Sequence, residues 1–251
     1  MDNQIELEVQ RGRTWLTTKY NNVLVKFAYP PVQGTQQECF TAINHDTELR
    51  PAEGLELALL TYGAYNGKES EWQDVRKDCF QGGYTRVSVR NLWIPKKTFS
   101  FDPSLSGVLV ENDLQGECFI NKMQVPDLSN SDVWVQNEEG VYVSKNENSK
   151  FIPESKHKLG EHTKDTFAKD NYAQTKLTPE GAELFAKTAF DKGKKLWIYG
   201  VDINSISSPV QWASVLGEDS YRLGIGVWVD NRYYRAFGVF SKTGEASPKK
   251  I

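Results

Sequence analysis

The neighbouring residues best suited to acid–base chemistry are His45 and Asp46. The ordinary pKa of histidine lies near neutral pH, and a carboxylate can orient its ring, so histidine often acts as a general base. Alternating apolar residues predict a strand from Glu38 to Asn44, which would present this pair at a strand end. One hypothesis is therefore a hydrolase or transferase with His45 as the general base. The alternative is an ordinary surface or capping histidine.

The other histidines and the cysteines do not show a metal-binding pattern. His157 and His162 are five residues apart, whereas two ligands on one helical face are four apart. Cys39, Cys79 and Cys118 are widely separated and show no CxxC spacing. We expect no metal site, and because no nucleotide-binding loop is found, we expect no cofactor. The cysteines are interpreted as small buried residues in a reducing compartment, with one activated thiol as the alternative.

The stretch from Leu223 to Phe240 contains two segments of alternating apolar residues, separated by Asp230 and Asn231. Both separating residue types tolerate positive φ, so the pattern predicts a β-hairpin that turns there. Three positions of the first segment would pair with three of the second: Trp228 with Tyr233, Gly226 with Arg235, and Gly224 with Phe237. One face of this hairpin would be aliphatic and buried, and the other aromatic.

The aromatic face of the hairpin is the predicted ligand-binding surface, formed by Trp228, Tyr233, Arg235, Phe237, Gly224 and Gly226. Glycine would let a ligand ring or a peptide approach the backbone, and arginine beside aromatic rings suits an anionic or planar ligand. Tryptophans on strands are more often part of a core, because each buries a large area. The sequence leaves both interpretations open, a groove and a packed layer.

Apolar residues with helical spacing predict two helices over about residues 51–80. The first would begin at Pro51, whose missing N–H is tolerated in a first turn, and the second would have Ser70 as its N-cap. Together they form an αα-hairpin whose apolar side must cover a sheet or another helix.

A third helix is predicted over about residues 179–192. Thr178 is its expected N-cap, Pro179 lies in its first turn, and Gly193 provides the left-handed residue after its end. Between the αα-hairpin and this helix, the polar residues 145–176 are interpreted as an irregular surface excursion. After it, a strand over 196–203 would carry Trp197 and Tyr199 on one side, and a short helix is expected over 210–216.

The predicted fold class is α+β: mainly antiparallel sheets with the αα-hairpin and the third helix packed on them. The chain has 251 residues and 39% hydrophobic residues, enough for a substantial core. We expect a single domain over 1–240 and a frayed C-terminal tail over 241–251. Alternating residues predict further strands at 5–9, 14–19, 23–29, 85–94, 107–111, 117–125, 133–136 and 141–144.

The charge of the chain is small and evenly spread. Its formal net charge is −3, with lysines and acids interspersed and no basic stripe, so nucleic-acid binding is not expected. No apolar run is long enough to cross a bilayer, and the first residues do not resemble a signal peptide, so we expect a cytoplasmic protein with no membrane partner.

Five short motifs are spread over about half of the chain: Leu49–Ala52, Leu92–Pro95, Phe151–Pro153, Glu180–Glu183 and Ala236–Val239. Their types and order resemble those of a group of uncharacterised archaeal proteins. No activity is known for that group, so the resemblance implies no function, cofactor or site residue.

The sequence therefore favours a non-catalytic protein that binds a small molecule or a protein partner through an aromatic sheet face. The alternatives are the enzyme with His45 as base and a structural assembly component. The identity of the partner and the oligomeric state do not follow from the sequence.

Overall fold

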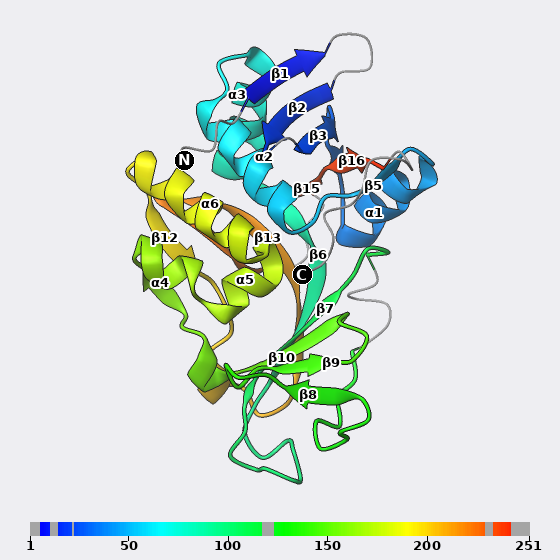
Figure 1. Cartoon of the computed structure of the whole chain (residues 1–251), viewed down its shortest axis with the longest axis vertical. Coiled ribbons are helices and arrows are strands. Elements are labelled where there is room, and N and C mark those ends of the chain that lie inside the picture. The colour runs from blue at the N-terminus through cyan, green and yellow to red at the C-terminus, as the bar shows by residue number, and fades with distance from the viewer. Residues whose placement is uncertain (1–5, 11–14, 22, 117–122, 229–232, 242–251) are drawn as a thin grey trace.

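The computed structural model describes residues 6–10, 15–21, 23–116, 123–228 and 233–241, and its architecture is α+β with mainly antiparallel sheets, as predicted. The strands of this part form a five-stranded sheet, at the top of Figure 1, and an eleven-stranded sheet that extends below it. The strands are β1 (Glu6–Gln10), β2 (Trp15–Tyr20), β3 (Val23–Ala28), β4 (Val32–Gln33), β5 (Leu49–Pro51), β6 (Tyr84–Ile94), β7 (Gly107–Asn112), β8 (Trp134–Gln136), β9 (Tyr142–Ser144), β10 (Ser149–Pro153), β11 (Gly160–His162), β12 (Lys195–Ile198), β13 (Val210–Asp219), β14 (Arg222–Trp228), β15 (Arg235–Ala236) and β16 (Gly238–Phe240).

The larger sheet has the order β11–β12–β14–β13–β6–β7–β10–β9–β8, and β15 joins it by pairing with β4 and β6. Among the described strands of this sheet, β12 runs parallel to β14 and the short β15 runs parallel to β6, and the other pairs are antiparallel. The smaller sheet has the order β1–β2–β3–β16–β5, so its fourth strand comes from the far end of the described chain. The short strands β15 and β16 therefore connect the two sheets.

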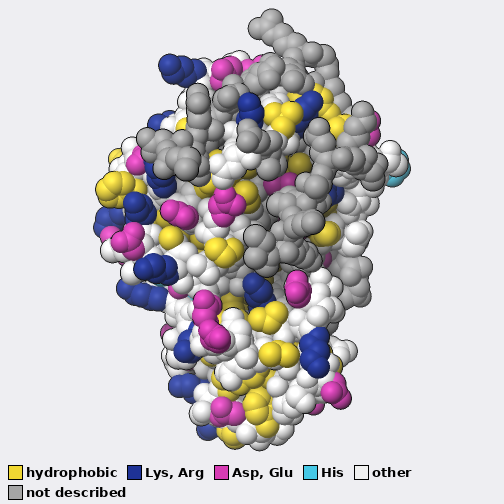
Figure 2. All heavy atoms as spheres, viewed as in Figure 1, with side chains coloured by type: hydrophobic (Ala, Val, Ile, Leu, Met, Phe, Trp, Pro, Cys, Tyr) yellow, Lys and Arg dark blue, Asp and Glu magenta, His cyan; other side chains and the backbone are white. Residues whose placement is uncertain are grey.

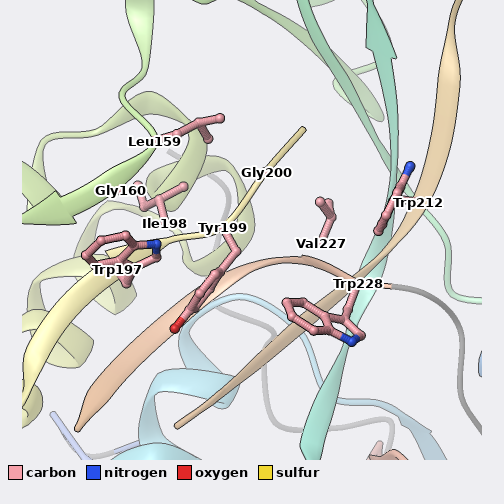
Figure 3. A pocket seen from close by; sticks show the side chains of 9 residues that line it. All are labelled: Leu159, Gly160, Trp197, Ile198, Tyr199, Gly200, Trp212, Val227 and Trp228. Atoms are coloured by element: carbon pink, nitrogen blue, oxygen red, sulfur yellow. The ribbon is translucent and has the colours of Figure 1, made fainter. Parts of the chain in front are cut away.

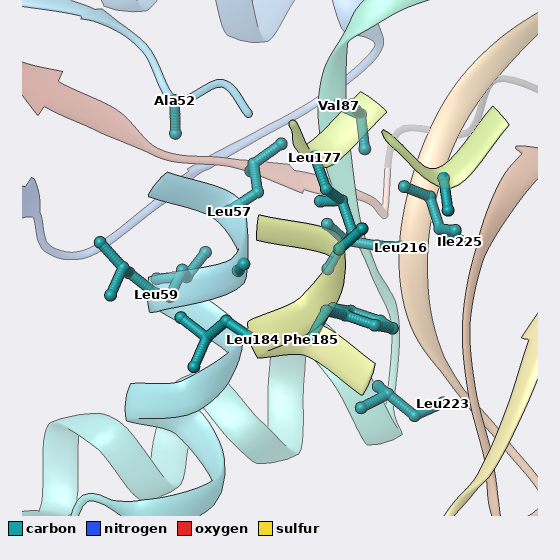
Figure 4. Packing of buried hydrophobic residues seen from close by; sticks show 14 of the residues in the cluster. Ala52, Leu57, Leu59, Val87, Leu177, Leu184, Phe185, Leu216, Leu223 and Ile225 are labelled. Atoms are coloured by element: carbon teal, nitrogen blue, oxygen red, sulfur yellow. The ribbon is translucent and has the colours of Figure 1, made fainter. Parts of the chain in front are cut away.

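Helices pack on one face of the larger sheet and bury its aliphatic residues. Figure 4 shows leucines of α2 and α6 in one buried cluster with the sheet residues Val87, Leu216, Leu223 and Ile225. The same buried cluster extends from Leu16 on β2 to Val239 on β16. The helices are α1 (Gln36–His45), α2 (Leu55–Asn66), α3 (Ser70–Val75), the π-helix η1 (Arg76–Gln81), the 3₁₀ turn η2 (Glu154–Lys156), α4 (Lys164–Ala168), α5 (Asn171–Leu177), α6 (Pro179–Asp191) and the 3₁₀ turn η3 (Ile203–Ser205).

The predicted αα-hairpin is present as α2, α3 and η1. Its boundaries differ from the prediction, since Pro51 ends strand β5, Gly54 is the N-cap of α2, and Ser70 is the first residue of α3 instead of its cap. The packing of the two helices depends on Gly63, because a Cβ at that position would overlap the Trp72 indole. Because Gly63 has no side chain, α2 leaves room for the fully buried Trp72 indole.

The helix predicted over 179–192 is confirmed as α6. The Thr178 hydroxyl accepts a hydrogen bond from the Gly181 amide at 3.2 Å, and Pro179 occupies the first turn. Gly193 follows the helix with φ +63°, the left-handed conformation that glycine adopts at low cost.

The predicted strand from Glu38 to Asn44 is wrong, because these residues lie in helix α1. Thr35 and Glu38 form a capping box, in which each side chain bonds the backbone N–H of the other residue. Capping satisfies two otherwise unpaired donors of the first turn. The buried residues Cys39, Phe40 and Ile43 also fit helical spacing, which a reading of alternation alone overlooked.

Two other segments differ from the prediction. Residues 145–176 contain β10, β11, α4 and most of α5, and two of their polar residues, Thr163 and Asp170, are the N-caps of α4 and α5. Residues 210–216 lie in strand β13, where pairing with β6 and β14 outweighs local helical spacing.

The predicted pairing within 223–240 is also wrong. Gly226 pairs with Val215 and Gly224 pairs with Gly217, while β12 occupies the other edge of β14. Both edges of β14 are therefore filled by strands other than the one that follows it. The predicted turn at Asp230 and Asn231 lies outside the described residues.

The surface in the orientation of Figure 2 is mixed in charge, with Lys and Arg side chains between Asp and Glu side chains. Hydrophobic side chains gather at the lower end of this face, in the region of β8 to β10. Among the described residues, no helix combines the length and apolar character that a membrane span needs.

Candidate functional site

A fork opens in the larger sheet where β12 ends. The Tyr199 amide still donates a hydrogen bond to the Ile225 carbonyl at 3.0 Å, but β12 stops at Ile198, whereas β14 continues to Trp228. The strand predicted to reach residue 203 is therefore shorter. Beyond the fork, residues of both sheet faces can line one space.

This space is a cleft of about 620 Å³, which we call the aromatic cleft. Figure 3 shows Trp197 and Tyr199 on one side of it and Trp212 and Trp228 on the other, with Val227 between them. The complete lining is Leu159, Gly160, Trp197, Ile198, Tyr199, Gly200, Trp212, Val227 and Trp228. None of these side chains carries a charge, so the cleft favours apolar and aromatic groups.

Glycines stand opposite aromatic residues in the sheet beside the cleft. Gly224 on β14 is the register partner of Trp197, and Gly217 on β13 is the register partner of Tyr84. Paired residues share one face of a sheet, so the rings lie above a strip without side chains. The Tyr199 ring fills part of that strip, because a Cβ at Gly224 would lie 2.6 Å from its Cε2.

The aromatic rings of the cleft form a connected group. The Tyr199 ring lies 6.2 Å from the Trp197 ring at 39° and 6.3 Å from the Trp228 ring at 88°. Outside the cleft, Trp228 stacks on Tyr84 with centroids 5.6 Å apart, and Arg222 lies over Trp197 at 4.4 Å. These contacts hold the walls of the cleft in defined orientations.

Tyr199 contributes its ring to the lining, but its hydroxyl oxygen is buried and is not exposed to the cleft. Burial and the negative charge of Asp219 raise the pKa of Tyr199 to about 12, while the nearby Arg222 opposes the shift. The hydroxyl is therefore protonated at neutral pH and can donate a hydrogen bond.

A buried polar cluster lies behind the wall formed by Trp212 and Val227. The Lys176 amine donates to the Ser214 hydroxyl at 2.5 Å and to the Gly226 carbonyl at 3.2 Å, and it lies 4.3 Å from the Tyr172 ring centroid. Burial alone holds the pKa of Lys176 well below its ordinary value. Since both Lys176 and Ser214 are buried, they support the wall and do not face the cleft.

Buried aromatic residues also lie behind Leu159 and Gly200. The Trp93 ring contacts the rings of His157 and Tyr172, at 5.8 and 5.9 Å. Burial lowers the pKa of His157, so its ring is neutral at physiological pH. This layer makes the base of the cleft rigid.

The predicted ligand-binding residues occupy different environments. Trp228 lines the aromatic cleft and is 39% exposed, whereas Phe237 is 1% exposed and belongs to the core. Tyr233 is 72% exposed and does not line the cleft. The Arg235 guanidinium donates to the Asp78 carbonyl at 2.5 Å, so it contacts the end of the π-helix. Gly224 and Gly226 lie beneath Tyr199, which covers the strip proposed as an open floor.

His45 and Asp46 lie at the end of α1, not at a strand end. His45 is the last residue of the helix and is exposed, and Asp46 is its C-cap, with a carboxylate that accepts from the Glu48 amide at 3.0 Å. Figure 1 shows α1 at the right-hand side and β12 at the left. The structure thus does not bring this pair to the aromatic cleft.

The other chemical candidates have ordinary environments. Cys39 and Cys79 are buried, the Cys39 thiol donates to the Val32 carbonyl at 3.4 Å, and burial raises the pKa of Cys79 to about 12; Cys118 lies outside the described residues. Among the described residues, no group of three or more His, Cys, Asp or Glu side chains could hold a metal ion. For the alternative of a structural assembly component, the relevant residues are two exposed valines at the sheet edge. Val133 precedes the outermost strand β8 and is 46% exposed, and Val135 lies on β8 and is 51% exposed.

Sequence reasoning missed the association of Trp197, Tyr199 and Trp212 with Trp228. The alternation around Trp197 and Tyr199 correctly put both rings on one side of a strand. The missing information was the neighbour of β14, because parallel pairing of two strands from separate parts of the chain leaves no local signal.

Comparisons with known proteins do not assign a family. No protein-family model and no curated protein matches the chain. A solved structure described as "Accommodation of massive sequence variation in Nanoarchaeota by the C-type lectin fold" is similar at 12% identity and a TM-score of 0.46, over 95% of this chain and 98% of that chain. A similarity of this size transfers neither a fold name nor a ligand to this chain.

Proposed function

We propose that this chain is a binding protein whose aromatic cleft accepts a small, largely apolar molecule. The observation that supports the proposal is the cleft itself, with about 620 Å³ of space, four aromatic walls and an uncharged lining. Ligand sites in proteins typically have about 300–1,000 Å³ and an apolar lining with few polar groups. The indole N–H groups of the lining would orient the ligand.

The cleft is supported from behind, which favours binding without a large rearrangement. Lys176 and Ser214 brace the strand that carries Val227, and Trp93 packs behind Gly200. A prearranged site loses little conformational entropy on binding, so its contacts contribute more of their free energy to affinity.

A screen of neutral aromatic fragments, including indole, by ligand-observed NMR tests the proposal. We expect binding that quenches tryptophan fluorescence and is lost in Trp228→Leu. Tyr233→Leu is the matched control, because Tyr233 is an exposed aromatic residue outside the lining, and it should bind like the wild type. Equal binding to both variants, or no binding to the wild type at any concentration reached, would refute the proposal.

The enzyme hypothesis with His45 remains a separate hypothesis without support from the cleft. His45 and Asp46 are absent from its lining, and α1 lies on the opposite side of the view in Figure 1. If His45 had a role in the proposed binding, His45→Ala would weaken it; we expect no change.

A further inference from the structure

Two walls of the aromatic cleft meet nearly at a right angle. The rings of Tyr199 and Trp228 are inclined by 88°, with centroids 6.3 Å apart. The face of an aromatic ring carries partial negative charge and attracts a cation within about 6 Å of its centroid. At this ring separation, one cation can lie within that range of both centroids. Trp197, 6.2 Å from Tyr199, adds a third ring.

The composition of the lining disfavours an anion. The lining has no lysine or arginine, so a carboxylate or phosphate would exchange its hydration for indole N–H groups alone. The charged residues that act on Tyr199 are Asp219 and Arg222, which are register partners and offset each other. Arg222 lies over Trp197 at 4.4 Å, so one face of this ring already contacts a guanidinium and Tyr199 and Trp228 remain the principal rings for a bound cation.

The apolar remainder of the cleft limits the type of cation. An ammonium ion with N–H groups would lose strong hydration beside Leu159, Ile198 and Val227, and the lining has no carboxylate to replace it. A methylated amine is weakly hydrated and presents methyl groups to these residues and to the rings. Its substituent would fill the rest of the cleft.

We propose that the aromatic cleft binds a methylated organic cation, with a trimethylammonium group held between Tyr199 and Trp228. This inference rests on the proposed binding function and adds the charge and chemical class of the ligand to it. It predicts that affinity depends on positive charge, not on size or apolar area alone.

Choline and 3,3-dimethylbutan-1-ol test this dependence, because they have nearly the same shape and only choline is charged. Titration of the full chain by NMR or tryptophan fluorescence should show choline binding about tenfold more tightly than the alcohol. Equal affinity would overturn the inference and leave the proposed function intact. If indole binds and choline does not, the cation inference is likewise overturned and the proposed function stands. If indole, choline and the alcohol all fail to bind, both proposals are contradicted.

Variants separate the rings from the neighbouring charges. Trp228→Leu keeps an apolar wall and should abolish the preference for choline over the alcohol. Tyr221→Leu is the control, because Tyr221 is 76% exposed, contacts Lys194 and lies outside the lining, so the preference should persist. Arg222→Gln should strengthen choline binding and Asp219→Asn should weaken it. Opposite signs for these two variants would show an anion site and overturn the inference.

Discussion

Lys176 lies in an environment that is unusual for a lysine, because its side chain is fully buried. Its amine is buried, has no carboxylate partner among the described residues, and relies on the Ser214 hydroxyl, the Gly226 carbonyl and the face of Tyr172. The polar stretch before α6 predicted a solvated lysine, because composition does not reveal which side chain of a helix points inward. Burial of such a group is a tertiary effect that only the packing of α5 on the sheet could show.

The lowered pKa of Lys176 makes a prediction about stability and pH. The unfolded chain binds a proton at Lys176 below the ordinary pKa of 10.5, and the folded chain resists doing so. The contribution of Lys176 to the free energy of unfolding therefore rises with pH. As pH falls from 10.5 toward the lowered pKa, this contribution becomes more unfavourable to the folded state. Between pH 6 and 9, we expect Lys176→Met to show a smaller rise in the free energy of unfolding than the wild type, measured by urea denaturation.

Lys187→Met provides the control for that measurement. Lys187 is on α6, is 63% exposed and pairs with Asp191 at 2.5 Å, so its substitution should leave the slope with pH unchanged. Parallel curves for Lys176→Met and the wild type would show that Lys176 does not titrate between the two states.

At the scale of elements, the predictable helices were those with recognised ends. Thr178, Pro179 and Gly193 defined α6, whereas α1 was assigned as a strand although Thr35 and Glu38 have capping-box spacing. The strands of the larger sheet were mostly found by alternation. Their pairing was not, because β14 pairs with β12 and β13 and not with the segment that follows it.

The capping box of α1 can be tested by Thr35→Ala. Loss of the hydroxyl leaves the Glu38 amide without its bond, which should reduce the free energy of unfolding by about 1 kcal/mol. Thr41→Ala is the matched control, since Thr41 is exposed within the same helix and alanine is the better helix former. Chemical denaturation should show a loss for the first variant only; equal effects would argue against the cap.

The contact of α2 with α3 can be tested at Gly63. Alanine would favour the helical backbone, but its methyl group would overlap Trp72, so we expect Gly63→Ala to destabilise the protein by about 1–3 kcal/mol. In a Trp72→Leu background the same substitution should cost less, because the indole is absent. A double-mutant cycle without coupling between the two positions would contradict this packing.

At the scale of the whole molecule, one buried cluster joins both sheets. Leu16 and Val239 of the smaller sheet belong to the same cluster as Phe185 on α6 and Ile225 of the larger sheet. The fold class followed from the order of elements, but this continuity did not, since it depends on contacts between distant segments. It supports the proposal of one domain over residues 1–240.

That proposal predicts one cooperative unfolding transition. Differential scanning calorimetry should give a single peak with equal calorimetric and van't Hoff enthalpies. A chain ending after Tyr234 would lack β15 and β16 and should lose the cooperative transition, whereas one ending after Ser241 should keep it. Two separate peaks in the full chain would show that the sheets fold independently.

The position of β16 between β3 and β5 has a consequence during biosynthesis. The ribosome synthesises β3 and β5 long before β16, the strand that pairs with both. The edge of β3 therefore stays without its partner until translation passes Phe240. An unpaired strand edge invites association with other chains. We expect the nascent polypeptide to be most vulnerable to aggregation in that interval, and to depend on chaperones for longer than its size suggests.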